Sequence, residues 1–408
     1  MTVALLLPSR ALAQSSPWIR FGANGVLLYT FADPVPNGRS LGEVRLVQPV
    51  VMAHAGALSN RLRLLTTINL EGLTIPDGEL TPGAWGEGFI DRRHPHTYVH
   101  ELVLSFNDRL SRLGGGAIVS LAAGKGFVPF GTDDPMSRPP LRYPVNHHLA
   151  QILERAIAVA GVRAGPVMLE GGLFNGDEPE RPGQWPKIGR FGDSWSGRLT
   201  VLPIRALELQ ASHALVHSPE HRPGAGSDQH KWSLSGRWEG NVREHPVYGL
   251  VEWARTSEAD GFFVFRSFLA EGAWSPGRSL LYYRFERSDR PEEERTLDLF
   301  RSKRPHFENS ILGITRWTIH TAGYGLALAS PGTRLNARPF LELSYGRMAN
   351  VGGGVFDVRT FYGRSSFWSV GVGVRLNPGM RMQRMGRYGV AQNTALGPAG
   401  EQHGGHAQ

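Results

Sequence analysis

The stretch Trp-Ser-Leu-Ser-Gly-Arg-Trp-Glu, residues 232–239, decides the fold, because large apolar residues alternate in it with polar ones. A β-strand points successive side chains to opposite faces, so this segment would have one apolar and one charged face. Residues 281–286, Leu-Tyr-Tyr-Arg-Phe-Glu, repeat the pattern. In a soluble sandwich the apolar face would pack against a second sheet. In an outer-membrane barrel it contacts lipid, and the charged face lines a lumen.

The same alternation recurs along most of the chain, divided by turns rich in Gly, Pro, Asn and Asp. About 16 candidate strands lie near 17–31, 43–57, 60–73, 97–107, 115–126, 155–164, 166–176, 195–203, 206–217, 229–241, 246–257, 261–274, 278–289, 308–321, 334–347 and 364–377. An even number returns both ends to one side, as a single-chain bacterial barrel requires. We therefore predict an all-β fold, a single antiparallel transmembrane β-barrel of about 16 strands over residues 14–378.

The connections between these strands differ in length. Tight turns such as 164–166 and 275–277 tend to alternate with long connections such as 74–96 and 177–194. Outer-membrane barrels combine short periplasmic turns with longer external loops in this way. The connection 127–154 is too long and too rich in proline for a hairpin. We expect it to fold inward and narrow the pore.

Composition excludes several classes of protein. The chain of 408 residues has no cysteine, which excludes disulfides and thiolate metal sites. No apolar run reaches the roughly 18 residues of a transmembrane helix. Residues 3–7 are apolar and Ala-Leu-Ala follows at 11–13, which predicts that residues 1–13 are the remnant of a signal peptide and therefore predicts export. Residues 379–408 lack a strand pattern and end in a stretch containing Gly and His, so we predict a flexible tail.

The charge of the chain indicates its partners. The net charge is +8, with 44 Lys and Arg residues spread beside the acidic ones over the whole length. A nucleic-acid-binding protein would gather such charge on one patch or helix, so we expect no nucleic-acid partner. We predict location in the bacterial outer membrane, contact with the lipid bilayer and lipopolysaccharide, and passage of small polar solutes. The sequence leaves the oligomeric state open.

Alternation also predicts which charges face the lumen. The expected pore-lining residues are Arg61, Arg63, Arg198, Arg237, Arg284, Arg316, Glu239, Glu286 and Glu342. The residues expected to face lipid are Leu234, Trp238, Trp253, Tyr283, Leu343, Val370 and Val372. Rings of charge inside a pore set its ion preference. Alternatively, these charges pair across neighbouring strands and only stiffen the wall.

A histidine-rich motif, Asp-Arg-Arg-His-Pro-His-Thr-Tyr-Val-His-Glu, occupies residues 91–101. Neutral imidazole is the commonest metal ligand in proteins. The predicted ligands of a divalent transition metal such as copper or zinc are His94, His96, His147 and His148. Binding would weaken as protonation removes the imidazole lone pair. The alternative is that these rings only form hydrogen bonds, and no other cofactor is expected. In an extended strand, His100 would lie at the lipid interface and Glu101 would point inward.

Two motifs carry a family resemblance. Residues 91–96 with 100–101, and 129–136 with 138–139, resemble an uncharacterised family of outer-membrane β-barrel proteins that carries the motif Asp-Arg-Arg-His-Pro-His. This family is distantly similar in layout to the phosphate-selective-type porins, and the similarity spans most of residues 17–378. The resemblance implies a barrel but no assigned activity. The chain departs from the porin pattern by continuing beyond Asn377, where porins present a terminal aromatic residue to the assembly machinery.

These observations favour an outer-membrane, porin-like channel for small polar solutes or ions. One alternative is a non-transporting barrel that binds a metal ion or a surface partner through its histidine loops. Another is a secreted soluble β-protein. Ser, His and Asp are plentiful, but nothing in the sequence selects a catalytic nucleophile. We therefore expect no enzymatic activity, although composition alone leaves a barrel hydrolase open.

Overall fold

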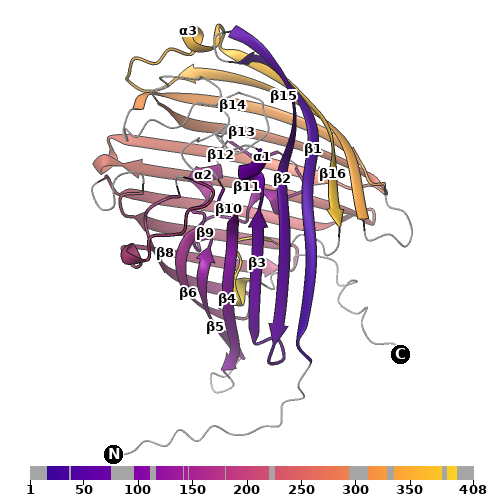
Figure 1. Ribbon diagram of the computed structural model, residues 1–408, viewed down its shortest axis with the longest axis vertical. Coiled ribbons are helices and arrows are strands. Elements are labelled where there is room, and N and C mark those ends of the chain that lie inside the picture. Colours follow the sequence, from indigo (N-terminus) through magenta and orange to yellow (C-terminus); the bar gives the residue numbers. More distant parts are fainter. Residues whose placement is uncertain are drawn as a thin grey trace, which may run out of the picture.

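The computed structural model describes residues 16–35, 38–74, 96–110, 116–140, 142–145, 147–179, 181–219, 226–293, 311–328, 335–378 and 384–392. Within them, sixteen strands form one barrel (Figure 1). The first eight strands are β1 (Trp18–Val35), β2 (Arg39–Ala57), β3 (Leu62–Asn69), β4 (Val99–Leu110), β5 (Ala117–Gly126), β6 (Arg155–Ala164), β7 (Val167–Phe174) and β8 (Ser194–Ile204). The others are β9 (Leu207–Val216), β10 (Gln229–Val242), β11 (His245–Glu258), β12 (Phe263–Trp274), β13 (Ser279–Glu293), β14 (Ile311–Leu326), β15 (Leu335–Asn350) and β16 (Ser366–Pro378).

Helical segments in the described residues are short. They are α1 (Glu71–Thr74), α2 (His147–Ala150), α3 (Val358–Tyr362), η3 (Pro135–Ser137), η4 (Ile188–Arg190), η5 (Ala259–Gly261) and η6 (Gly389–Ala391). None of these described helices is long and apolar enough to cross a membrane.

Each strand pairs antiparallel with its sequence neighbours, and β1 closes the ring by pairing with β16. In that closing register, Val26 lies opposite Arg375 and Tyr29 opposite Val372. Closure removes the free edges that would leave backbone N–H and C=O groups unpaired in lipid. The predicted fold class, an antiparallel barrel of about 16 strands, is confirmed.

The outer surface of the barrel is apolar, as the alternation predicts. On β15, Leu343 is 54 % exposed on the outer face, whereas its neighbour Glu342 is 2 % exposed on the inner face. On β16, Val372 is 51 % exposed. The seven residues predicted to face lipid all lie on the outward register of their strands. This exterior suits a hydrocarbon surrounding.

The two ends of the barrel differ. Short turns such as 165–166, 205–206 and 243–244 join strands at one end. The connections at the other end include the long ones, 70–98, 127–154 and 175–193. We refer to these as the short-turn end and the long-loop end. Barrels of this kind place short turns in the periplasm and long loops outside the cell.

The connection 127–154 folds into the barrel, as predicted. Apart from residues 141 and 146, it is described, and nearly all of its side chains are buried. We call it the inward loop. Its apolar residues Phe127, Phe130 and Met136 pack in one cluster with Val103 of β4 and Val159 of β6. The inner face of this wall is therefore apolar where these residues of the loop pack against it.

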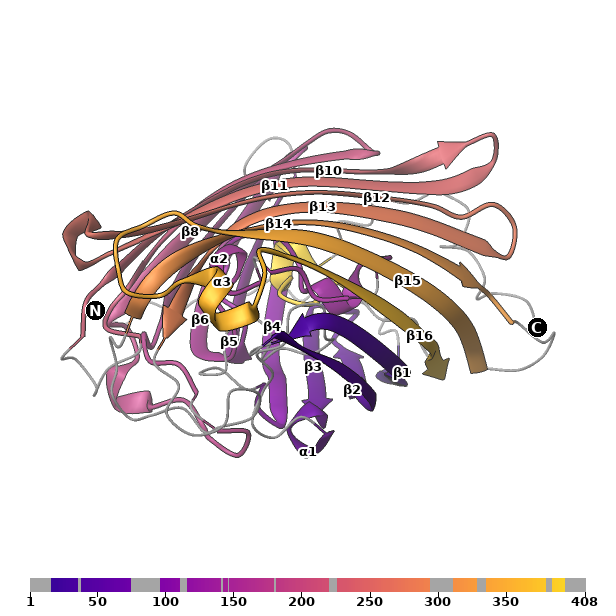
Figure 2. The same cartoon turned by 90° about the horizontal axis from the view of Figure 1, so that it is seen from above.

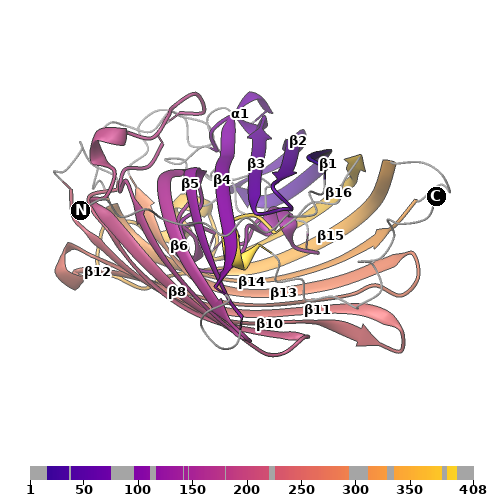
Figure 3. The ribbon, with the colours of Figure 1, turned by 90° about the horizontal axis from the view of Figure 1, so that it is seen from below.

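A second segment, residues 384–392, also lies inside the barrel. Figures 2 and 3 show this yellow segment between the wall formed by β1–β6 and the wall formed by β10–β14. Met385 and Tyr388 join the same apolar cluster as the inward loop. The prediction of a flexible tail over 379–408 is therefore corrected for residues 384–392, which are buried against the wall. The remaining residues of that tail lie outside the described residues.

Candidate functional site inside the barrel

Most of the predicted pore-lining residues point into the barrel. Buried inward-facing side chains include Arg198, Arg237, Arg284, Glu286 and Glu342. Arg63 shares the inward register of Leu65 on β3, and Glu239 shares that of Arg237 on β10. Arg237 donates from Nε to Glu239 of the same strand at 2.6 Å, whereas Arg198 forms a pair across neighbouring strands, with Glu170 of β7 at 2.7 Å, as the alternative proposed. At these seven positions the side chains therefore face inward, as the alternation predicts.

Two of the predicted lining residues do not face the lumen. Arg61 belongs to the turn between β2 and β3, where its side chain is 40 % exposed beside Asp108. Arg316 lies on the outward register of β14 and donates from Nε to Asp289 at 2.7 Å. Its neighbour Trp317 points inward instead, because it packs against Tyr362 of α3 in an apolar cluster inside the barrel.

The inward loop is held first by Asp133. Nη1 of Arg237 donates to both carboxylate oxygens of Asp133, at 2.6 and 2.7 Å. Nη2 of Arg384 donates to Oδ1 at 2.9 Å. Burial alone would raise the pKa of Asp133, but the surrounding arginines, led by Arg237 and Arg384, hold it well below its ordinary value. The loop therefore carries a fixed negative charge between two arginines.

Arg138 forms a second anchor a few residues further along the loop. Its Nη2 donates to Thr132 Oγ1 at 2.7 Å, which shapes the loop. Its guanidinium also lies 3.7 Å from Glu271 of β12 and 3.8 Å from Glu252 of β11. Burial lowers the pKa of Arg138, yet these two carboxylates more than offset it, so the pKa is raised. The loop is thus tied to the β11–β12 wall by a buried positive charge.

A third group of contacts holds the loop near its α2 end. The backbone N–H of Val145 donates to Glu286 Oε2 at 2.6 Å, and Nη1 of Arg284 donates to the carbonyl of Arg142 at 2.5 Å. Nη2 of Arg375 on β16 donates to the carbonyl of Met136 at 2.7 Å. These strands lie across the barrel from β5 and β6, where the loop begins and ends. The loop therefore crosses the lumen.

One glycine makes this crossing possible. Gly131 has φ +64°, in the left-handed region, and a Cβ at this position would lie 1.7 Å from the carbonyl oxygen of Ala150. A residue with a side chain would clash with the backbone here. The two segments of the inward loop that contain Gly131 and Ala150 can approach closely only because position 131 is glycine.

Residues 384–392 add a set of contacts that the sequence prediction missed. Oε1 of Glu208 on β9 accepts from Arg384 Nη2 at 2.7 Å and from Arg387 Nη2 at 3.0 Å. Tyr388 donates its hydroxyl proton to Glu101 at 2.7 Å and accepts from the N–H of Phe127 at 2.9 Å. Met, Arg and Tyr in residues 384–388 distinguish this segment from the Gly-rich end of the chain, and that difference was the available signal.

Histidines gather where the inward loop meets β4. The rings of His96 and His100 have centroids 4.7 Å apart, and His147 lies 5.8 Å from His96 and 5.0 Å from His148. The structure thus brings together three of the four predicted ligands. The fourth, His94, lies outside the described residues. Burial, followed by the neighbouring His148, lowers the pKa of His147 well below its ordinary value.

The predicted orientation of His100 is wrong. Thr67 of β3 pairs with Glu101, but the next residue of β3 pairs with Val99, so the register shifts at His100. Such a β-bulge adds one residue to a strand and re-aims its side chain. As a result, His100 and Glu101 are both buried inside the barrel. Nδ1 of His100 lies 2.6 Å from Glu154 Oε1.

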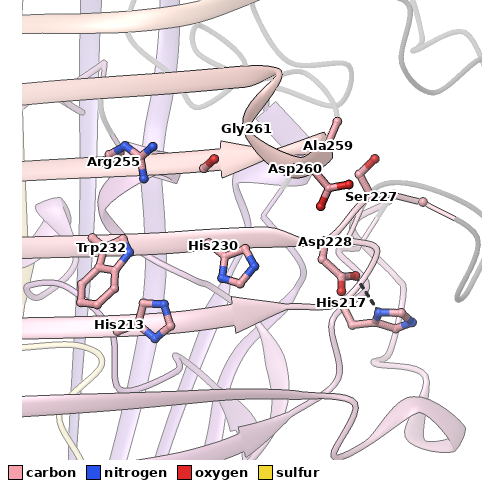
Figure 4. Close-up of a pocket in the computed structure, with 12 residues that line it drawn as sticks. His213, His217, Ser227, Asp228, His230, Trp232, Arg255, Ala259, Asp260 and Gly261 are labelled. Atoms are coloured by element: carbon pink, nitrogen blue, oxygen red, sulfur yellow. Dashed lines mark hydrogen bonds and ion pairs between the residues drawn. The ribbon is translucent and has the colours of Figure 1, made fainter.

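A separate cavity of about 810 Å³ lies on the outer wall at the long-loop end. Figure 4 shows His213, His230, Trp232 and Arg255 projecting from β9, β10 and β11 into it, with the ion pair His217–Asp228 at its edge. These four strand residues occupy outward positions. The cavity therefore belongs to the exterior of the barrel and not to its lumen.

The comparisons agree with the fold. No model of a protein family matches the chain, and no curated relative matches it. Among solved structures, the chain is similar to the anion-selective porin from Comamonas acidovorans, with 10 % identity, 90 % of this chain and 100 % of that chain covered, and a TM-score of 0.52. It also aligns with OmpT of Vibrio cholerae, an outer-membrane protein, at 11 % identity, with 90 % and 100 % covered and a TM-score of 0.48. The chain therefore has the fold of the outer-membrane porins, a closed antiparallel barrel of sixteen strands.

Proposed function

We propose that this protein is a porin-like channel of the bacterial outer membrane, which lets small polar solutes or ions cross. The observation that carries the proposal is the inward loop, which crosses a closed barrel and is fastened to the opposite wall. Asp133 and Arg138 supply its charged anchors, to Arg237 and to Glu252 with Glu271. A fixed loop between charged walls narrows a lumen without abolishing its polar character.

The pairing of charges bears on the selectivity of this channel. Rings of unpaired charge give a pore its ion preference. Here Arg198 bonds to Glu170 at 2.7 Å and Arg284 bonds to Glu271 at 2.7 Å. Because these positive and negative groups offset one another, we infer that the channel has modest selectivity between anions and cations. Anion selectivity belongs to the Comamonas acidovorans porin, and the similarity of this chain to that porin supports the fold alone.

Single-channel recording in a planar bilayer tests the proposal. The wild-type protein should give discrete conductance steps, and deletion of residues 131–143 should enlarge them. A deletion of residues 351–355, an exposed connection at the long-loop end, is the control and should leave conductance unchanged. Heat-modifiable migration on a gel would establish that each variant is folded. A folded wild-type barrel with no conductance, before or after the loop deletion, would refute the channel and favour a non-transporting barrel.

The location of the protein is tested separately, by fractionation. Recovery of the protein with outer membranes is the expected result, and recovery in a soluble fraction would instead support the secreted β-protein. A channel that is not an enzyme should also show no hydrolytic activity on lipid or peptide substrates.

We further propose that lipopolysaccharide contacts the outer wall at the long-loop end. Arg255, His213 and His230 offer hydrogen-bond donors there, and Trp232 offers an aromatic surface of the kind found at membrane interfaces (Figure 4). Lipopolysaccharide should co-purify with the wild-type protein. Replacement of Arg255 by alanine should reduce the amount bound, whereas an unchanged amount would contradict this contact.

A further inference from the structure

We propose that His96, His147 and Asp134 form a buried site for a divalent transition-metal ion, which fastens the inward loop to the segment that leads into β4. One potential ligand atom from each residue lies within 4.8 Å of the others. All three side chains are buried. This set differs from the one predicted from the sequence, because Asp134 takes part and His148 does not belong to the group.

The donor atoms define the class of metal. Two imidazole nitrogens and one carboxylate oxygen suit zinc and its first-row neighbours, including copper and cobalt. Calcium and magnesium prefer sites made wholly of oxygen ligands. With no cysteine in the chain, imidazole and carboxylate are the strong ligands available for such an ion.

The environment of Asp134 points to a cation. Its Oδ1 accepts a hydrogen bond from the N–H of Met136 at 2.7 Å, which caps η3. Its Oδ2 is buried and has no hydrogen-bond partner among the described residues. An isolated carboxylate oxygen is strongly disfavoured in such surroundings. A metal ion placed between Asp134, His96 and His147 would satisfy this oxygen.

The surroundings of His96 are those of a metal-binding histidine. Its Nδ1 lies 2.9 Å from Glu71 Oε2 and 2.9 Å from Asn69 Nδ2. Glu71 is itself positioned by the backbone N–H of Gln48 at 3.2 Å. In the tautomer that donates from Nδ1 to the Glu71 carboxylate, Nε2 presents its lone pair to a metal. The competing interpretation is that the histidines form only a hydrogen-bonded cluster.

The position of the site gives it a structural role. His147 and Asp134 belong to the inward loop, whereas His96 precedes β4 on the wall. A metal ion bound to all three would cross-link the loop to the wall on the side opposite the Asp133 and Arg138 anchors. Any effect of the metal on conductance depends on the proposed channel function. Metal binding itself does not.

Calorimetry on the full-length protein in detergent tests the site. Because His403 and His406 offer unrelated ligands, both are replaced by alanine in every sample. After treatment with a chelator, titration with zinc chloride should show about one equivalent bound per chain. His96→Ala, His147→Ala and Asp134→Asn should each weaken affinity at least about tenfold. His148→Ala, which alters the adjacent histidine outside the set, is the matched control and should change affinity little.

A second measurement keeps the proposal testable if these variants fail to fold. Pulsed electron paramagnetic resonance on the copper-loaded parent protein, without the three substitutions, should detect two coordinated imidazoles. Absence of zinc and copper binding, absence of coordinated imidazole, or zinc affinity that survives His96→Ala combined with His147→Ala in a folded barrel would overturn the proposal. Conductance of the chelator-treated protein is recorded separately, so a working channel without a metal site is distinguished from a metal-binding barrel that does not conduct.

Discussion

Asp133 of the inward loop accepts two hydrogen bonds from a single nitrogen of Arg237, Nη1, at 2.6 and 2.7 Å, although the two residues are 104 positions apart in the chain. Both side chains are buried. The pair joins the loop to the β10 wall, and Arg384 brings the C-terminal segment to the same carboxylate at 2.9 Å. Three separate parts of the chain therefore meet at one charge.

Removing that charge should destabilise the barrel interior. In Asp133→Ala, Arg237 and Arg384 lose a shared partner while they remain buried, and such a loss costs about 3–5 kcal/mol. Urea-induced unfolding of the protein in detergent micelles, followed by tryptophan fluorescence, measures the change. The control is Asp228→Ala, which breaks an exposed ion pair with His217 and should cost no more than about 1 kcal/mol. Equal effects of the two substitutions would contradict the role given to Asp133.

The same carboxylate predicts a dependence on pH. Its pKa is lower in the folded protein than the ordinary value of about 3.9, so its stabilising effect is fully present above that value. The effect is lost as the pH falls through the lower, folded-state pKa, because protonation then removes the charge. The difference in unfolding free energy between wild type and Asp133→Asn should therefore persist from pH 7 to about 4 and shrink only below it. A difference that vanishes between pH 7 and 5 would show that another group is responsible.

The fold could be predicted from the sequence because lipid and lumen impose opposite requirements on alternate residues. Leu341, Leu343 and Tyr345 are exposed on the outside of β15, while Glu342 and Ser344 are buried inside. This contrast between exposed apolar and buried polar residues locates every strand in the sequence, and the number of strands located is even. The inward course of 127–154 was also predictable, since its length and prolines are unsuited to a hairpin.

The same rule failed where the lumen is apolar. Alternation predicted that Arg316 faces inward, on the assumption that charged side chains face the lumen. However, α3 covers that part of β14, so Trp317 is the residue buried there. A single-residue bulge turned the side chain of His100 inward, whereas Glu101 and the residues that follow it on β4 keep their expected faces. Residues 384–392 have no strand pattern, and their place inside the barrel depends on Glu101 and Glu208 from distant strands. Tertiary contacts of this kind leave no periodic trace in a sequence.

The lipid-facing assignment predicts the cost of a charge on the outer wall. Val372 lies in the middle of β16 and faces outward, so Val372→Arg would place a guanidinium in the hydrocarbon. The expected loss is about 2–4 kcal/mol in the free energy of unfolding, measured by denaturant titration in lipid vesicles. Leu376→Arg, close to the short-turn end of the same strand, is the matched control and should cost about 0–1 kcal/mol. A smaller loss at Val372 than at Leu376 would show that the band of lipid contact lies elsewhere.

The C-terminal segment should restrict the lumen and adjust its charge. Truncation after Pro378 removes Arg384, Arg387 and Tyr388, whereas truncation after Gln392 keeps all of their contacts and serves as the control. Without the segment, Glu208 loses both arginine partners and Glu101 loses the Tyr388 hydroxyl. We therefore expect the shorter chain to have a larger single-channel conductance. We also expect its reversal potential in a potassium chloride gradient to shift toward cation preference, because two carboxylates become exposed to the aqueous path. If both truncated proteins fold and match the full-length protein in conductance and reversal potential, residues 384–392 do not line the path that solutes take.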